Sequence, residues 1–81
     1  PFNPSTTIEY ALPKEENISI VIYDVMGRKI STLIDEVQGP GYKKVQWSSR
    51  NDLGEMMASG VYFFRISAGK NSQIRKMLLI K

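Results

Sequence analysis

The sequence contains no cysteine and no histidine among its 81 residues. Without cysteine, the chain can form no disulfide framework, no thiolate nucleophile and no cysteine-based zinc site. Without histidine, it lacks the usual general base and the commonest metal ligand of proteins. Acid–base catalysis could still use carboxylate groups.

The carboxylates form no pattern that indicates catalysis. A glycosidase-like pair must face each other across about 5–9 Å. The adjacent pairs Glu15–Glu16 and Asp35–Glu36 fall in expected turns, where neighbouring side chains diverge into solvent. The other acidic residues are Glu9, Asp24, Asp52 and Glu55. We therefore predict that the chain is not an enzyme.

The polar stretch SSRNDLGE, residues 48–55, raises the question of a calcium site. An EF-hand-like loop has acidic or amide side chains at alternating positions before its glycine. Before Gly54, those positions hold Ser49, Asn51 and Leu53, which supply no carboxylate. We therefore expect no metal ion here and no other cofactor.

The chain also lacks a long hydrophobic run and a concentration of charge. No apolar run approaches the ~20 residues of a membrane helix, so we expect no transmembrane segment. The net charge is +3, and the largest basic cluster is Arg75–Lys76 with Lys81. Because no basic stripe is interleaved with aromatic residues, we expect no nucleic-acid partner.

The length corresponds to one domain at most. Hydrophobic residues make up 42% of the sequence and charged residues 23%, which is ordinary for a globular domain. The chain does not begin with Met and opens with PFNPS, a composition typical of the end of a linker. We therefore assign residues 1–4 to a linker and residues 5–81 to a single domain of a longer protein.

Alternation of apolar and polar residues predicts six strands and a shorter seventh. The predicted strands are Ser5–Leu12, Ile18–Asp24, Arg28–Leu33, Tyr42–Ser48, Val61–Ser67 and Gln73–Lys81, with the short edge strand at Met56–Ala58. One open sheet would leave large apolar patches exposed, because both faces of several strands are apolar. The fold class is therefore all-β, an immunoglobulin-like antiparallel β-sandwich of about seven strands.

Two segments carry more specific expectations. The strand Ile18–Asp24 is rich in β-branched residues and apolar on both faces, so we expect it to be central and covered on both sides. The apolar residues of the segment 28–37 have the spacing of a helix, at Ile30, Leu33, Ile34 and Val37. Because β-branched residues favour strands, we expect a strand to Leu33 and an irregular or one-turn helical piece after it.

The stretches DVMG (Asp24–Gly27) and NDLG (Asn51–Gly54) predict two turns of the same kind. In each, an Asp or Asn side chain can accept hydrogen bonds from turn amides, and a glycine can take a positive φ. Val25 and Met26 are unusual at a turn tip. They either fold over the open end of the sandwich or contact a partner, and the sequence leaves both interpretations open.

Three aromatic residues could form a carbohydrate platform if they were exposed in a row: Tyr42, Trp47 and Tyr62. Trp47, however, shares a strand face with Val45, and Tyr62 shares one with Phe64. Aromatic residues dominate the burial energy of small domains. This pattern favours core positions for Trp47 and Tyr62.

In order, the stretches PFNPSTTIEYALP, ISIVIYDVMGRKISTLID, GPGYKKVQWSSRNDLGEMMASGVYFFRI and RKMLLIK resemble one family over essentially all 81 residues. It is the type A C-terminal sorting domain of the Bacteroidetes type IX secretion system, also called the Por secretion system sorting domain. The family's fold is similar to the immunoglobulin-like domain of flagellar hook-capping proteins.

Eight residues match the family's motifs YDxxGR, SGxY and the terminal KM-apolar-K: Asp24, Gly27, Arg28, Gly60, Tyr62, Lys76, Met77 and Lys81. The chain departs from the family at Ser48–Ser49, where relatives usually have an acidic residue or Asn and then Gly. Met56–Met57 also replaces the commoner polar-then-aliphatic pair. The first departure puts the shape of that turn in doubt.

The resemblance implies a non-catalytic sorting signal at the C-terminus of a larger cargo protein. The partners that it implies are the cargo domain on the same chain, the outer-membrane type IX translocon and its shuttle components. The implied localisation is the periplasm in transit, then the cell surface or the medium. In many relatives the domain is removed after export.

The last segment, RKMLLIK, is expected to be both a structural strand and the part that the translocon binds. An exposed strand edge offers backbone donors and acceptors to a partner. Lys81 and the free carboxylate would then fix where the strand ends. Two other functions remain as alternatives: a structural assembly module of an extracellular filament or hook-cap-like scaffold, and an accessory carbohydrate-binding module.

Overall fold

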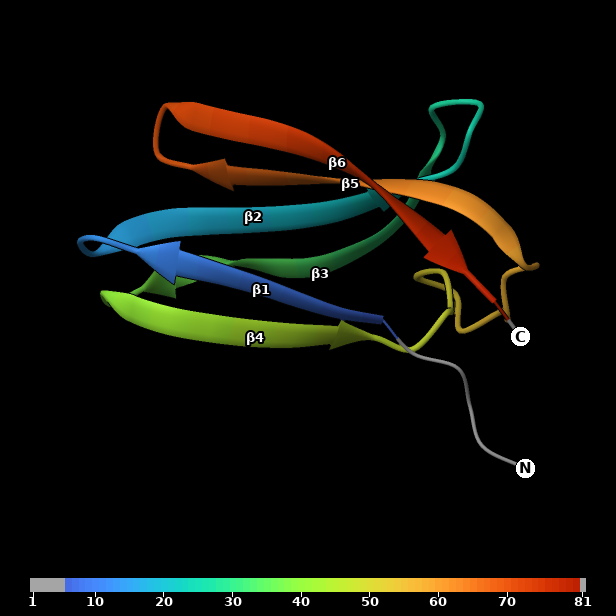
Figure 1. Ribbon diagram of the computed structural model, residues 1–81, viewed down its shortest axis with the longest axis horizontal. Coiled ribbons are helices and arrows are strands. Elements are labelled where there is room, and N and C mark those ends of the chain that lie inside the picture. The colour runs from blue at the N-terminus through green and yellow to red at the C-terminus, as the bar shows by residue number, and fades with distance from the viewer. Residues whose placement is uncertain (1–5, 81) are drawn as a thin grey trace.

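The computed structural model describes residues 6–80, and the expected linker at residues 1–4 lies outside them. Six antiparallel strands form two sheets (Figure 1). The strands are β1 (Thr6–Leu12), β2 (Glu16–Tyr23), β3 (Lys29–Gln38), β4 (Gly41–Trp47), β5 (Gly60–Ala68) and β6 (Asn71–Leu79). β1 pairs with β4, and the larger sheet has the order β3-β2-β5-β6. The prediction of an all-β sandwich is confirmed.

The core lies between the two sheets. Its buried residues are Ile8, Leu12, Ile18, Ile20, Ile22, Trp47, Tyr62 and Leu79. In β2, the three isoleucines are fully buried, as alternation along a strand with one covered face requires. A hydrogen bond of 2.6 Å, donated by the Tyr10 hydroxyl to Gln38 Oε1, also links β1 with β3 across the sandwich.

β2 is central, as predicted, but it is not covered on both sides. The face opposite the isoleucines carries Ser19, Val21 and Tyr23, all half-buried. The small sheet packs against only one face of the large sheet, and β1 passes in front of β3 in the view of Figure 1. The outer face of β2 is therefore shielded by its neighbours' side chains alone.

The prediction that β3 ends at Leu33 and continues as an irregular or helical piece is wrong. The strand runs to Gln38, and its pairing with β2 shifts register twice. Ile20 pairs with Ile34 and Val21 with Thr32, so Leu33 is an extra, bulged residue. The bulge lets consecutive Leu33 and Ile34 both pack against the core. A bulged strand therefore imitates helical spacing.

This longer strand also corrects the placement of the acidic pairs. Asp35 and Glu36 lie within β3 and not in a turn, with side chains on opposite faces of the strand. Glu16 is the first residue of β2, and its carboxylate lies 3.7 Å from Lys14 Nζ.

The predicted seventh strand at Met56–Ala58 does not form within the described residues. Only one isolated bridge, between Arg50 and Met56, stands in its place. The loop between β4 and β5 holds itself by internal bonds, such as Met57 N–H to the Ser49 carbonyl at 2.7 Å. These bonds occupy backbone groups that a ladder would need.

Candidate functional site

The turn between β2 and β3 is organised by the carboxylate of Asp24. Asp24 Oδ1 accepts hydrogen bonds from the backbone N–H groups of Met26 and Arg28, both at 2.9 Å. Asp24 Oδ2 lies 2.8 Å from Arg28 Nε. Gly27 donates its N–H to the Asp24 carbonyl at 3.0 Å and has a φ of +82°. Asp24, Gly27 and Arg28 of the YDxxGR motif therefore each have a role in closing this turn.

These contacts also set the electrostatics of the turn. The N–H of Arg28, the Arg28 side chain and the N–H of Met26 lower the pKa of Asp24 below its ordinary value. The hydrogen bond from the Arg28 N–H is the largest cause of this lower pKa, and desolvation, which opposes it, is the second largest. The Arg28 side chain remains 77% exposed. The turn thus fixes the Asp24 carboxylate in place, while much of the Arg28 guanidinium remains accessible to solvent.

The turn at Asn51–Glu55 repeats this arrangement with different charges. Asn51 Oδ1 accepts from the N–H groups of Leu53 and Glu55, at 3.0 and 2.8 Å, and Asn51 Nδ2 donates to Glu55 Oε1. Gly54 takes a φ of +85°. Because two backbone N–H groups already use the Asn51 oxygen, this loop has the geometry of a self-closed turn and not of a cation site. Within residues 6–80, no three acidic residues gather as potential metal ligands.

The SGxY motif starts β5 and builds a tyrosine corner, a feature of Greek-key sandwiches. The Tyr62 hydroxyl donates to the Ala58 carbonyl at 2.6 Å. Gly60 has a φ of +151°, which side chains rarely adopt. The Tyr62 ring meets Trp47 edge to face, with 5.1 Å between ring centroids. The departure at Ser48–Ser49 forms a bend after β4, in which Ser49 is buried with a φ of +67°.

The terminal motif lies on β6, the last strand of the large sheet. Met77 faces the core, and Lys76 lies on the exposed outer face. The pairing places Met77 opposite Tyr62 and Lys76 opposite Phe63. Lys81 lies outside the described residues, and Ile80 follows the strand with 72% of its surface exposed.

The structure brings the described motif residues to one end of the sandwich. A hollow of about 480 Å³ lies between the Asp24 turn and the tyrosine corner, lined by Arg28, Met57 and Tyr62 among others. Met77, on the neighbouring strand β6, pairs directly with Tyr62 of this tyrosine corner. Val25 and Met26 at the tip are 65% and 77% exposed, so the interpretation that they fold over the core is wrong.

The carbohydrate platform is not formed. Trp47 and Tyr62 are 1% and 7% exposed, as the sequence favoured. Tyr42 alone of the three lies on the surface.

Among residues 6–80, the structure contains no apolar helix of membrane-spanning length.

Sequence reasoning missed the arrangement of the two edges of the large sheet. At β3, Asp52 donates its N–H to the Ile30 carbonyl and accepts the Thr32 N–H on Oδ1, at 3.0 and 3.1 Å. At β6, no described strand pairs with the outer edge. Its outward side chains include Ile74 and Leu78, 64% and 59% exposed. The sequence shows these apolar residues, but it does not show that their strand lies at an edge of the sheet.

Comparison with known proteins places the fold and the family. No curated protein matches the chain. A solved structure of FlgD from P. aeruginosa, a flagellar hook-capping protein, aligns with a TM-score of 0.72 and 18% identity. The alignment covers 93% of this chain and 59% of the FlgD chain. At that identity the likeness concerns the fold alone.

A family model described as a secretion system C-terminal sorting domain matches residues 1–81, the whole chain. The match agrees with the turn, corner and terminal-strand motifs now seen together at one end of the sandwich. The chain therefore belongs to the C-terminal sorting domain family of the type IX secretion system.

Proposed function

We propose that this domain is a non-catalytic sorting signal, which its partners recognise as a folded β-sandwich through its last strand. The translocon and shuttle components of the type IX system are the proposed partners, and a cargo domain on the same chain is the proposed load. The family match over residues 1–81 supports the sorting role. The outer edge of β6, with which no strand of residues 6–80 pairs, is the observation that carries the mode of recognition.

The edge suits recognition because the strand is held in place before a partner arrives. Leu79 is 2% exposed in the core, and all nine residues of β6 pair with β5 without a register shift. In an antiparallel pair, every second residue directs its N–H and C=O away from the partner strand. A fixed edge loses little conformational freedom on binding, and this favours affinity.

The motif residues are proposed to shape this end of the domain. Asp24, Gly27 and Arg28 fix the turn, and Gly60 and Tyr62 fix the start of β5 beside β6. Lys76 and Met77 belong to β6 itself, and Lys81 is proposed to mark its end. The proposed route is through the periplasm and then to the cell surface or the medium, with residues 1–4 as linker and 5–81 as the sorting domain.

A fusion experiment tests the address. Residues 1–81 are joined to the C-terminus of a periplasmic reporter in a host with the type IX machinery. We expect export of the reporter, measured as its fraction outside the cell. A matched fusion ending at Lys76 should remain in the periplasm. Retention of the full fusion, with the domain protected from protease and therefore folded, would contradict the proposal.

Replacement of Lys81 by Ala tests the terminal residue separately. We expect export to fall while the unfolding temperature stays unchanged. Unchanged export would remove Lys81 from the recognised features.

The assembly module remains a second candidate, because FlgD has the same fold. It predicts a retained fusion and a domain that forms ordered multimers. Sedimentation of the folded domain distinguishes this candidate from the sorting function.

A further inference from the structure

We propose that the outer edge of β6 binds an extended acidic segment of another protein, which adds a strand beside β6. This inference rests on the proposed function and names the chemistry of the partner. The segment would carry two adjacent carboxylates, one for each face of the sheet, with apolar residues on either side.

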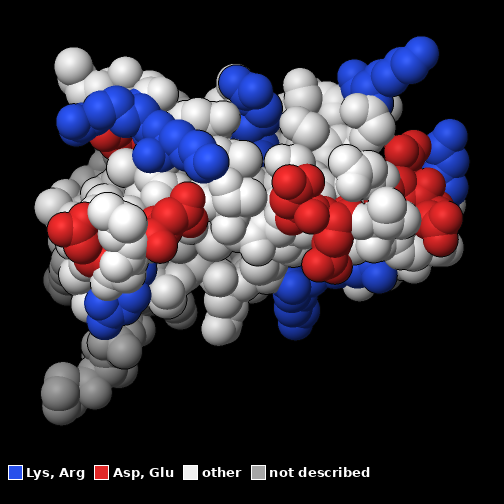
Figure 2. All heavy atoms as spheres, turned by 180° about the vertical axis from the view of Figure 1, so that it is seen from behind, with Lys and Arg blue, Asp and Glu red and all other residues white. Residues whose placement is uncertain are grey.

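The charge distribution of the chain is the first observation. All eight acidic residues precede residue 56, and residues 56–81 contain only basic charges. The basic residues after that point are Arg65, Lys70, Arg75, Lys76 and Lys81. In Figure 2, most acidic side chains lie across the middle of the molecule, with basic side chains above and below them.

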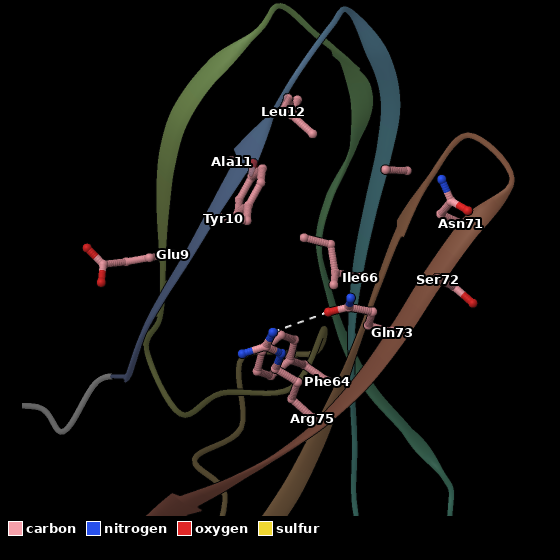
Figure 3. Close-up of a pocket in the computed structure, with 11 residues that line it drawn as sticks. Glu9, Tyr10, Ala11, Leu12, Phe64, Ile66, Asn71, Ser72, Gln73 and Arg75 are labelled. Atoms are coloured by element: carbon pink, nitrogen blue, oxygen red, sulfur yellow. Dashed lines mark hydrogen bonds between the residues drawn. The ribbon is translucent and has the colours of Figure 1, made fainter.

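The placement of Arg75 and Lys76 is the second observation. Consecutive residues of a strand point to opposite faces, so the two cations flank the β6 edge on both sides. Figure 3 shows Arg75 and Gln73 reaching from β6 toward β1, with 3.3 Å between Arg75 Nη2 and Gln73 Oε1. They line a groove of about 260 Å³, which Glu9 also lines, although the Glu9 carboxylate is directed away from Arg75. A carboxylate from an added strand would meet Arg75 on this inner side.

On the outer face of the large sheet, the second cation, Lys76, lies between exposed apolar side chains. Ile74 and Leu78 flank Lys76 on the outer face of β6 and are mostly exposed. An added strand with a carboxylate opposite Lys76 would place its neighbouring apolar side chains beside these two residues. Opposite charges and apolar pairs across strands are both stabilising.

A second copy of this chain fits the edge less well. Antiparallel pairing of two β6 strands about their centre would place Arg75 against Arg75, and like charges directly opposite are destabilising. β3 carries the adjacent acids Asp35 and Glu36, but Asp52 occupies part of its edge and two register shifts interrupt it. A partner with a regular acidic strand therefore matches better.

Peptide binding tests the inference on the purified 81-residue chain. The probe is a ten-residue peptide of alternating Thr and Val with two adjacent glutamates at its centre, and the control peptide has two glutamines there. We expect the glutamate peptide to shift the amide signals of β6 selectively in NMR titrations. We expect the glutamine peptide to bind about fivefold more weakly, as the loss of two cross-strand charge pairs predicts. Equal binding of both peptides, or no binding, would overturn the inference.

Two matched double variants locate the binding edge. Arg75→Gln with Lys76→Gln should weaken glutamate-peptide binding about fivefold. Lys43→Gln with Lys44→Gln, an equal charge change on the edge strand β4, should leave it unchanged. If the chain instead associates with itself and Asp35→Asn with Glu36→Asn abolishes that association, the occupant is a second copy and the inference is wrong.

The export assay separates this inference from the proposed function. If the peptide fails to bind while export still requires the last residues, the sorting function stands and the acidic partner is wrong. If the Arg75/Lys76 variant loses peptide binding but exports its reporter normally, the acidic edge site stands and its role in sorting is wrong.

Discussion

The two edges of the large sheet, β3 and β6, differ in almost every physical respect. β3 is interrupted by two bulges, carries acidic residues, and has part of its backbone satisfied by Asp52. β6 is regular for nine residues, carries only basic charges, and has no described neighbour on its outer side. Open edges are sites of unwanted pairing, and bulges or covering loops protect against it. The protection lies at β3, which leaves β6 as the edge that can take a partner.

Burial distinguishes β6 further, because the strand is open at its edge but anchored through one face. The first prediction therefore has the largest effect. Leu79→Ala should lower the free energy of unfolding by about 2–5 kcal/mol, since it opens a cavity in the core. Leu78→Ala is the matched control and should cost about 0.5 kcal/mol or less, because that side chain is mostly exposed. Urea denaturation measures both, and similar losses would show that β6 is not anchored by one face.

Removing the cap on β3 should make the two edges more alike. Asp52→Ala deletes the acceptor for the Thr32 N–H and should cost about 0.5–1.5 kcal/mol. Hydrogen exchange at Thr32 should become faster, and self-association should rise as the edge is freed. Leu53→Ala in the same loop is the control, because Leu53 is 84% exposed. Unchanged exchange at Thr32 would mean that Asp52 does not protect this edge.

The contribution of the Asp24 turn to the free energy of unfolding should depend on pH. Because hydrogen bonds lower the pKa of Asp24 in the folded state, its contribution to stability is present above the ordinary carboxyl value. That contribution is lost as the pH falls through the lower, folded-state pKa. Asp24→Asn should therefore flatten the loss of stability between about pH 5 and about pH 2, as followed by urea denaturation at each pH. Asn51→Asp in the equivalent turn should add an acid-dependent loss, and an unchanged profile in both variants would contradict this assignment.

The smallest effect is expected at the charges of the β6 edge. Arg75→Gln with Lys76→Gln should change the free energy of unfolding by no more than about 0.5 kcal/mol, because both side chains are exposed. Thermal unfolding measured with and without salt tests this. A large loss would mean that the pair serves folding, and peptide binding by that variant could then not be interpreted as edge recognition.

The sequence predicted the elements well where only neighbouring residues matter. The alternation in Ile18–Tyr23 placed the three isoleucines of β2 on one face, and all three are buried, although the expected cover on the opposite face is absent. The spacing of Asp24 and Gly27 predicted a turn whose hydrogen bonds have now been described. These features follow from the geometry of a strand or turn and require no knowledge of the rest of the chain.

The errors arose where distant segments decide the outcome. Leu33 and Ile34 suggested a helical piece because a bulge, fixed by pairing with β2, places both against the core. Met56–Ala58 was predicted as a short edge strand, but the hydrogen bond between Met57 and Ser49 leaves only an isolated bridge at Met56. The outcome depends on which distant backbone groups pair with each segment, and the pattern of residues in a single sequence does not show this.

The sequence by itself determined the all-β class, the approximate positions of six strands, the two similar turns and the absence of acidic side chains after residue 55. Only the tertiary structure decided that β6 borders the sheet, that Asp52 covers part of β3, and that the motif residues meet at one end. The physical reason is the range of the interactions. Side-chain alternation is set by adjacent residues, whereas an edge exists only when the pairing of all the other strands has been settled.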